Sequence, residues 1–171
     1  MPEKKAYITI LGRSSWAVLN TYYAALMEKA YYPDNIYIFA EDTYSEDIPK
    51  IIEGMKILSA EFDFNPKIKF SLVEENDFIT AVKKIGGLIK ELKRQNYSIA
   101  IDITSGRKIL VAAALIPAVK LKMSHVFYLA VKNLESKPYM MIPLANQQLR
   151  DFAEEVEKGV TDGVVDGTKQ P

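Results

Sequence analysis

The sequence predicts an α/β fold: a Rossmann-like, doubly wound and mainly parallel sheet with helices on both faces, followed by a short extra C-terminal strand and a helix. Three observations predict it. Short β-branched and aromatic segments, mostly apolar on both faces, alternate with longer segments of helical periodicity. Five strand segments follow one another with helices between them, which is the pattern of βαβ units. The 171 residues, 49% of them hydrophobic, suffice for one domain with a buried core.

Five segments are predicted to form the parallel strands. They are short and rich in β-branched and aromatic residues, as strands buried on both faces are. In chain order they are AYITIL at 6–11, NIYIFA at 35–40, KIKFSLV at 67–73, YSIAIDI at 97–103 and HVFYLAV at 125–131. The single histidine, His125, begins the last segment, and we interpret it as a structural residue at a strand edge.

Helical segments separate these strands. They are WAVLNTYYAALMEKA at 16–30, SEDIPKIIEGMKILSAEF at 45–62, DFITAVKKIGGLIKELKRQ at 77–95 and an alanine-rich segment that follows Lys108. Ser45 is expected to cap the second helix, and Asn76 or Asp77 the third, because their side chains accept hydrogen bonds from the first backbone N–H groups. Pro117 predicts either a kink or an early end in the fourth helix.

The C-terminal part is predicted to close the sheet. YMMIP at 139–143 is expected to form a short antiparallel strand, and ANQQLRDFAEEVEKG at 145–159 a closing helix. We therefore predict one domain over 1–158 and a flexible tail over 159–171. No apolar stretch approaches the length of a membrane span, and the N-terminus lacks a signal-peptide core. These features are typical of a cytoplasmic protein with no membrane partner.

Composition excludes several classes of function. Lys plus Arg and Asp plus Glu each total 22, whereas proteins that coat long nucleic acids usually carry a basic excess. We expect no long nucleic acid as a partner, while a small anion needs only a local site. With no cysteine, one histidine and no GxGxxG or Walker pattern, we expect no metal and no cofactor. The acid pairs Glu41-Asp42 and Glu74-Glu75 are interpreted as solvated loop residues, with a metal or ribose contact as the alternative.

Two loops form the candidate ligand site. In an open α/β sheet, ligands bind beyond the carboxyl ends of the strands, near the point where the strand order reverses. The first strand ends in LGRSS and the fourth in DITSGRK, and a helix follows each loop. Because the first and fourth strands are neighbours in the usual order, we expect the two loops to face each other. The candidate ligand contacts are Gly12, Arg13, Thr104, Ser105, Gly106 and Arg107.

Both loops have the composition of a phosphate site. Glycine permits close approach of the backbone, a helix N-terminus offers N–H groups without partners, and basic side chains add charge. A base in the first turn of a helix opposes the helix dipole, so Arg107 and Lys108 favour a bound anion there. The alternative is that the loop hydroxyls are only helix caps. We interpret Asp102 as an anchor of its loop rather than as a catalytic residue.

The fourth-strand loop resembles a known signature. A strand ending in Asp-x-Thr, followed by Ser/Gly-Gly-Arg-Lys and an alanine-rich helix, is similar to the signature of CRISPR-associated Rossmann-fold (CARF) domains. Here it spans Asp102–Ala114, and the loop Gly12–Trp16 is similar to the family's other ligand loop. The resemblance covers the chain from the first strand to about residue 150. One departure is Ser105, where many CARF domains have a second glycine.

The resemblance implies a ligand and a partner. CARF domains form homodimers and bind a cyclic oligoadenylate across the two-fold axis, and most are fused to an effector domain. This chain leaves little room for an effector, so we expect it to be similar to the small standalone ring nucleases. Those enzymes open cyclic tetra-adenylate into linear di-adenylate with 2′,3′-cyclic phosphate ends, without a metal, and so switch off type III CRISPR antiviral signalling.

The resemblance also implies catalytic residues. In the ring nucleases a serine of the first loop and the lysine of the fourth-strand motif support cleavage. Lys108 corresponds to that lysine, and Ser14 is the first candidate for the serine, with Ser15 as the adjacent alternative. Two other interpretations stay open: a non-catalytic sensor of the same ligand, and an unrelated Rossmann-like nucleotide-binding module.

Overall fold

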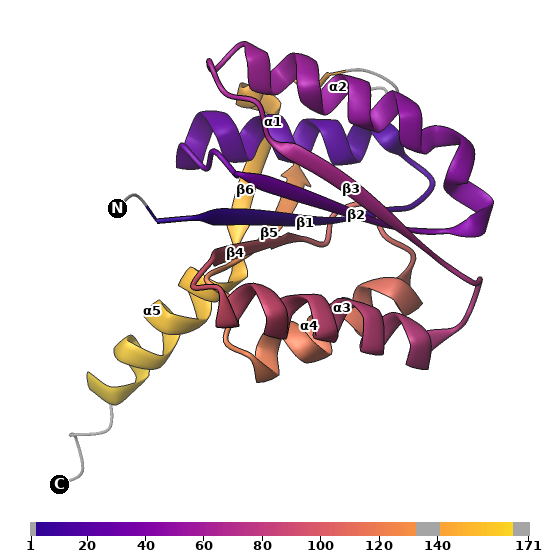
Figure 1. Cartoon of the computed structure of the whole chain (residues 1–171). Coiled ribbons are helices and arrows are strands. Elements are labelled where there is room, and N and C mark those ends of the chain that lie inside the picture. The colour runs from indigo at the N-terminus through magenta and orange to yellow at the C-terminus, as the bar shows by residue number, and fades with distance from the viewer. Residues whose placement is uncertain (1–2, 133–140, 166–171) are drawn as a thin grey trace, which may run out of the picture.

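The computed structural model describes residues 3–132 and 141–165 and confirms the predicted α/β class. Within those residues the sheet has six strands in the order β3-β2-β1-β4-β5-β6 (Figure 1). The strands are β1 (Lys5–Leu11), β2 (Asn35–Glu41), β3 (Lys67–Val73), β4 (Ser98–Asp102), β5 (His125–Val131) and β6 (Gln147–Asp151). The helices are α1 (Ser15–Lys29), α2 (Ile48–Ala60), α3 (Phe78–Arg94), α4 (Lys108–Lys120) and α5 (Phe152–Val165), with short 3-10 turns η1 (Asp42–Asp47) and η2 (Leu144–Asn146).

The strand order reverses between β1 and β4. The chain starts at β1, moves outward through β2 to β3, and then crosses back to β4 on the other side of β1. Both neighbours pair with β1 in parallel, so that Thr9 lies between Ile38 of β2 and Asp102 of β4. The loops that follow β1 and β4 therefore leave the sheet at the same edge, as predicted.

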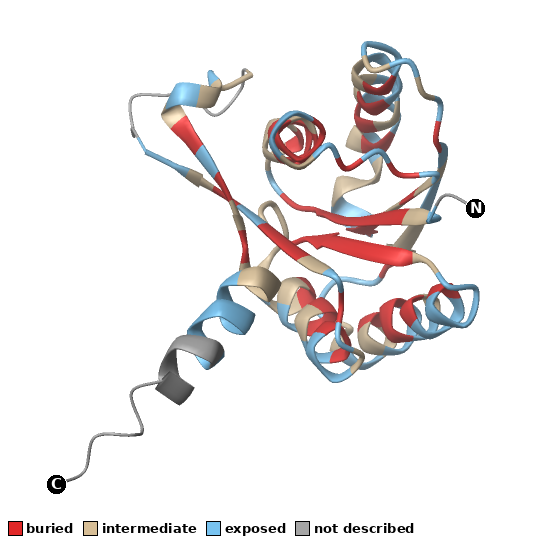
Figure 2. Ribbon diagram, turned by 90° about the vertical axis from the view of Figure 1, so that its left-hand side faces the viewer, coloured by how far each residue is buried: buried red, intermediate tan, exposed pale blue. Residues whose placement is uncertain are grey.

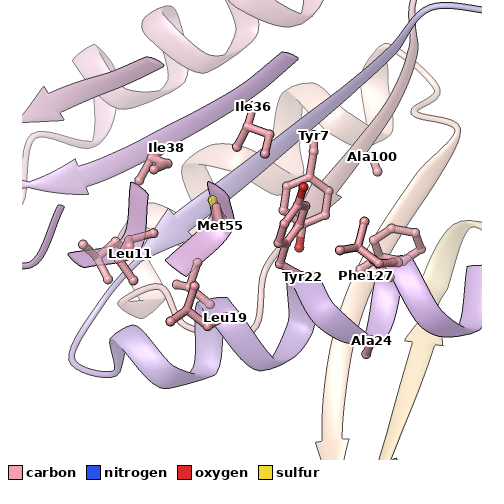
Figure 3. Packing of buried hydrophobic residues seen from close by; sticks show 14 of the residues in the cluster. Tyr7, Leu11, Leu19, Tyr22, Ala24, Ile36, Ile38, Met55, Ala100 and Phe127 are labelled. Atoms are coloured by element: carbon pink, nitrogen blue, oxygen red, sulfur yellow. The ribbon is translucent and has the colours of Figure 1, made fainter. Parts of the chain in front are cut away.

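The central strands of the sheet, β1 and β4, are buried on both faces because helices cover each of them. Helices α1 and α2 lie over one face and α3 and α4 over the other (Figure 1). Alternate residues of β1 serve the two cores: Tyr7 packs among Tyr22 and Phe127 on the α1 side (Figure 3), whereas Ile8 and Ile10 pack toward α3 and α4. The central strands lie between the two helical layers in Figure 2, which explains why they are mostly apolar, whereas β3 at one edge keeps Lys67, Lys69 and Phe70 exposed.

The helix boundaries confirm some capping predictions and correct others. Asp77 caps α3, since its Oδ1 accepts a hydrogen bond from Thr80 N at 3.0 Å. Ser45 caps no α-helix, because residues 42–47 form the 3-10 turn η1 and α2 begins only at Ile48. Pro117 does not end α4, which continues to Lys120.

The C-terminal elements differ from the prediction. Residues 139–140 lie outside the described part, and 141–143 form no strand. The antiparallel strand is β6, inside the segment predicted as helix, and only from Phe152 is the chain helical. Helix α5 leads away from the body (Figures 1 and 2) and continues to Val165. The domain boundary at residue 158 stays a prediction. No helix of the described residues is long and apolar enough to cross a membrane.

Tyr31 provides a test of how the central strands are held together. Its buried hydroxyl donates to the carbonyl of Ala6 on β1 at 2.9 Å and to that of Ser98 on β4 at 3.1 Å. We expect Tyr31→Phe to lower the free energy of unfolding by about 1–2 kcal/mol, because buried acceptors lose their donor. Urea denaturation measures the change. Tyr32→Phe is the control, since that ring is 42% exposed, and equal stability of the two variants would contradict the prediction.

Candidate functional site

The two loops after β1 and β4 are in direct contact, and glycine makes this possible. A Cβ atom on Gly12 would lie 2.0 Å from the carbonyl oxygen of Ser105, so no larger residue fits without moving the loop. Gly12 N donates to Ser105 Oγ at 3.2 Å, and that hydroxyl donates to the carbonyl of Ser14 at 2.9 Å. The serine that replaces a glycine of the resembled motif therefore ties the loops together.

Gly106 sets the depth at which the fourth-strand loop lies. A Cβ on Gly106 would approach Cγ2 of Ile10 at 2.6 Å and Cγ2 of Val111 at 2.8 Å. No described glycine has a positive φ, so both loop glycines are required for space rather than for an unusual backbone conformation. The backbone before α4 thus lies directly on β1.

Asp102 anchors the fourth-strand loop from its buried side, which agrees with our interpretation of this residue as a loop anchor. Its side chain is fully buried: Oδ1 accepts from Thr104 N at 2.9 Å and Oδ2 accepts from the hydroxyl of Thr9 at 2.9 Å. Burial raises the pKa of Asp102 to about 6, against the lowering effect of these hydrogen bonds. The hydroxyl of Thr104 accepts from Leu129 N at 3.0 Å, so its oxygen is already engaged within the fold.

The loops enclose an open cavity of about 500 Å³ at the carboxyl edge of the sheet. It brings together four of the predicted ligand contacts and the predicted catalytic lysine. The lining residues are Arg13, Asn76, Ser105, Gly106, Arg107, Lys108 and Ile109. Asn76 belongs to the loop after β3, which we interpreted only as a helix start. Because Asn76 follows the carboxyl end of a parallel strand, its position in the sequence could have identified it as a candidate ligand contact.

The three cations of the cavity differ in their partners. Arg107 donates to Glu75 and to Oε2 of Glu41, the latter at 3.1 Å. The hydrogen bond with Glu75 and the charge of Glu41 raise the pKa of Arg107 above its ordinary value. Arg13 and Lys108 are exposed and form no ion pair with any described residue. Positive charge without compensation therefore comes from these two side chains.

Two of the four acids at the ends of β2 and β3 are not simply solvated, which corrects our interpretation for Glu41 and Glu75, whereas Asp42 and Glu74 are exposed as expected. The side chain of Glu41 is 2% exposed and, like Glu75, is bonded to Arg107 across the position of β1. These contacts join residues 66 and 32 positions apart in the sequence. Local composition cannot show such a pairing, because it depends on the order of the strands.

The candidate serines lie beside the cavity rather than in its lining. Ser14 is the N-cap of α1, and its Oγ accepts from Ala17 N at 3.1 Å. Ser15 is buried, and its hydroxyl accepts from Nζ of Lys50 on α2 at 3.4 Å. Lys50 also lies 4.9 Å from the centre of the Trp16 ring. The capping alternative is confirmed for Ser14, and the catalytic roles of both serines stay predictions.

A group that could hold a metal lies at the opposite edge of the sheet. One ligand atom each of His125, Asp151 and Glu154 lies within 4.8 Å of the others. Nδ1 of His125 is 2.6 Å from Oδ2 of Asp151, and Lys29 donates to both oxygens of Glu154 at 2.9 and 3.0 Å. His125 begins β5, so this group is at the amino end of a parallel strand and takes no part in the cavity.

Solved structures share the fold. Can2 from Sulfobacillus thermosulfidooxidans, in complex with cyclic tetra-adenylate, has a TM-score of 0.52 over 85% of this chain and 36% of its own. Enterococcus italicus Csm6, bound to cyclic hexa-2′-fluoro-hexa-dAMP, has a TM-score of 0.57 over 96% and 47%. A type III CRISPR defence DNA nuclease activated by cyclic oligoadenylate has a TM-score of 0.56 over 77% and 19%.

These likenesses show a shared Rossmann-like α/β fold and nothing finer. Each of the three structures is 14% identical to this chain, and the chain spans less than half of each. No protein-family model and no curated protein matches the sequence. The fold agrees with the resemblance found in the Asp102–Ala114 motif, whereas ligand and activity need arguments from the cavity itself.

The contact between the loops can be tested with two glycines. Gly12→Ala should lower the free energy of unfolding by about 1–3 kcal/mol, because its Cβ overlaps the Ser105 carbonyl. Gly87→Ala is the control: it lies within α3 with no atom inside 4 Å of an added Cβ. The control should gain about 0.5–1 kcal/mol. Chemical denaturation measures both, and a Gly12→Ala protein as stable as the wild type would contradict the geometry.

Proposed function

We propose that the chain binds cyclic tetra-adenylate in this cavity. The observation that carries the proposal is that two cations without an ion-pair partner among the described residues, Arg13 and Lys108, line one cavity together with the N-terminus of α4. That N-terminus offers backbone N–H groups and partial positive charge to a phosphate. The shared fold of Can2 and Csm6, both solved with cyclic oligonucleotides, supports a ligand of this class.

The proposed active form is a homodimer. A two-fold axis presents the same residues of two copies to opposite phosphates of a cyclic tetranucleotide, which has matching symmetry. Each copy then contributes one Arg13 and one Lys108. Cleavage at two opposite phosphodiesters yields two linear di-adenylates, and in the cell this reaction would end type III CRISPR antiviral signalling.

The proposed activity is that of a metal-independent ring nuclease. The ribose 2′-oxygen attacks the adjacent phosphorus, and the P–O5′ bond breaks as the 2′-O–P bond forms, leaving a 2′,3′-cyclic phosphate. The 2′-hydroxyl proton leaves to solvent, and O5′ takes a proton from solvent. Because the nucleophile belongs to the substrate, no metal-activated water is required. The ammonium of Lys108 would stabilise the charge that develops on the phosphoryl oxygens, while Ser14, or Ser15, would orient the phosphate.

One observation favours the alternative of a non-catalytic sensor. Neither Ser14 nor Ser15 is part of the cavity lining, so the structure holds the cations ready for binding but not the proposed serine. A sensor would use the same loops and return the ligand intact. Incubation of the purified protein with cyclic tetra-adenylate and EDTA, followed by chromatography, separates these functions. Intact ligand after long incubation would support the sensor, and di-adenylate in EDTA would support the ring nuclease.

Lys108 carries the first prediction on turnover. Lys108→Ala should reduce the cleavage rate by about 10²-fold or more, because it removes the charge that faces the transition state. Single-turnover cleavage of cyclic tetra-adenylate, followed by chromatography, measures it. Lys120→Ala is the matched control: it deletes the same charge at the far end of α4 and should leave the rate unchanged. Product formation at the wild-type rate by Lys108→Ala would exclude the proposed mechanism.

The pairing of Arg107 carries a prediction on affinity. Glu75→Gln removes an ion-pair partner of Arg107, so its guanidinium becomes more available to a phosphate. We expect the dissociation constant for cyclic tetra-adenylate to fall roughly two- to fivefold, the range of an exposed ion pair. Isothermal titration calorimetry measures it. Glu74→Gln is the control, because it removes the same charge one residue away, from a side chain that is not paired with Arg107. An equal change of the dissociation constant in both variants would contradict the prediction.

A further inference from the structure

We propose that Asn76 forms a nucleobase subsite that selects adenine. This inference rests on the proposed function and identifies the residue that recognises the base. Asn76 lines the same cavity as Arg13 and Lys108 but comes from the loop after β3. Its side chain is exposed, and although its backbone N–H donates to Oε1 of Glu41 at 3.5 Å, its side-chain amide forms no hydrogen bond with a described residue. The amide is therefore available to a ligand that enters the cavity.

The turn that carries Asn76 is held on both sides. Glu75 before it is bonded to Arg107, and Asp77 after it caps α3 and donates its own N–H to the carbonyl of Glu74 at 3.1 Å. The carbonyl of Asn76 accepts from Phe78 N at 3.0 Å. Its φ of 64° lies in the left-handed region, which asparagine adopts more readily than most residues. The amide is thus presented from a fixed turn rather than from a free loop.

The other polar side chains of the cavity are poorly suited to read a base. Arg13 and Lys108 can only donate hydrogen bonds, and their charge suits phosphate. Arg107 is paired with two carboxylates, and the hydroxyl of Ser105 is bonded within the loops. Among the described lining residues, Asn76 has the side chain that can both donate and accept a hydrogen bond without breaking one within the fold.

A carboxamide matches the edge of adenine. Adenine presents the N6 amino group as donor beside the N7 acceptor, and an asparagine side chain bonds both at once. Guanine presents O6 and N7, which are both acceptors, so the amide oxygen of Asn76 would face a second acceptor. The cations hold the phosphates whichever base is attached. Asn76 would therefore determine which cyclic oligonucleotide the cavity prefers.

Asn76→Gly is the sharpest test, because glycine keeps the left-handed backbone without strain and removes only the amide. Dissociation constants for cyclic tetra-adenylate and cyclic tetra-guanylate are measured by calorimetry. The wild type should prefer the adenylate, and Asn76→Gly should reduce that preference about tenfold, by weaker adenylate binding. Asn76→Asp keeps the oxygen that accepts from N6 but lacks the N–H donor to N7, so it should weaken adenylate binding while the adenylate stays the preferred ring. Asn96→Gly, remote on the chain but also at a positive φ of 58°, is the control.

The outcomes separate the subsite from the proposed function. If the wild type binds cyclic tetra-adenylate and Asn76→Gly keeps the wild-type ratio of the two constants, the subsite is overturned and the proposed ligand stands. If the wild type binds neither ring, the proposed function is overturned together with the subsite. A reduced ratio in Asn76→Gly, with Asn96→Gly unchanged, supports both.

Discussion

The contact of Gly12 with the carbonyl of Ser105 is the constraint on which the site depends. Strands β1 and β4 are neighbours, so their loops leave the sheet together and lie too close for a Cβ at position 12. Ser105 uses its hydroxyl to bond both sides of the contact, and Asp102 fixes the same loop from beneath. Only with the loops this close do Arg13 and Lys108 line one cavity.

The formal net charge of zero conceals an uneven distribution at this edge of the sheet. Glu41 and Glu75 compensate Arg107, whereas Arg13 and Lys108 face solvent without an acidic partner in the described chain. Lys108 is also the first residue of α4, where the helix dipole opposes a cation. A bound anion would offset both the repulsion between the two cations and the unfavourable interaction of Lys108 with the helix dipole. The overall neutrality then disfavours long RNA, which needs many phosphate contacts, and leaves a small anion as the suited ligand.

The sequence predicted the parallel strands because such strands have a strong local pattern. The reversal between β1 and β4, and the loops that meet there, were expected from the usual strand order of this fold class. It missed β6, whose buried Gln147 and Asp151 are polar and look like part of an exposed helix. The cost of burying Asp151 is offset by a hydrogen bond from Val126 N and by contact with His125, both from β5. It also missed the pairing of Glu41 with Arg107. Such partners are set by tertiary structure, so no local window of sequence contains them.

The charge of the cavity bears on the size of the ring. In the proposed dimer each of two copies supplies two uncompensated cations, Arg13 and Lys108, so the shared site holds four positive charges against the four phosphodiesters of cyclic tetra-adenylate. A hexa-adenylate ring would leave two phosphates without a cation, unless Arg107 in each copy gave up Glu75 and Glu41. Because Glu41 is buried, releasing it would leave a carboxylate unpaired in the interior, which is costly. The pairing of Arg107 with Glu41 and Glu75 therefore favours the smaller ring in the proposed dimer.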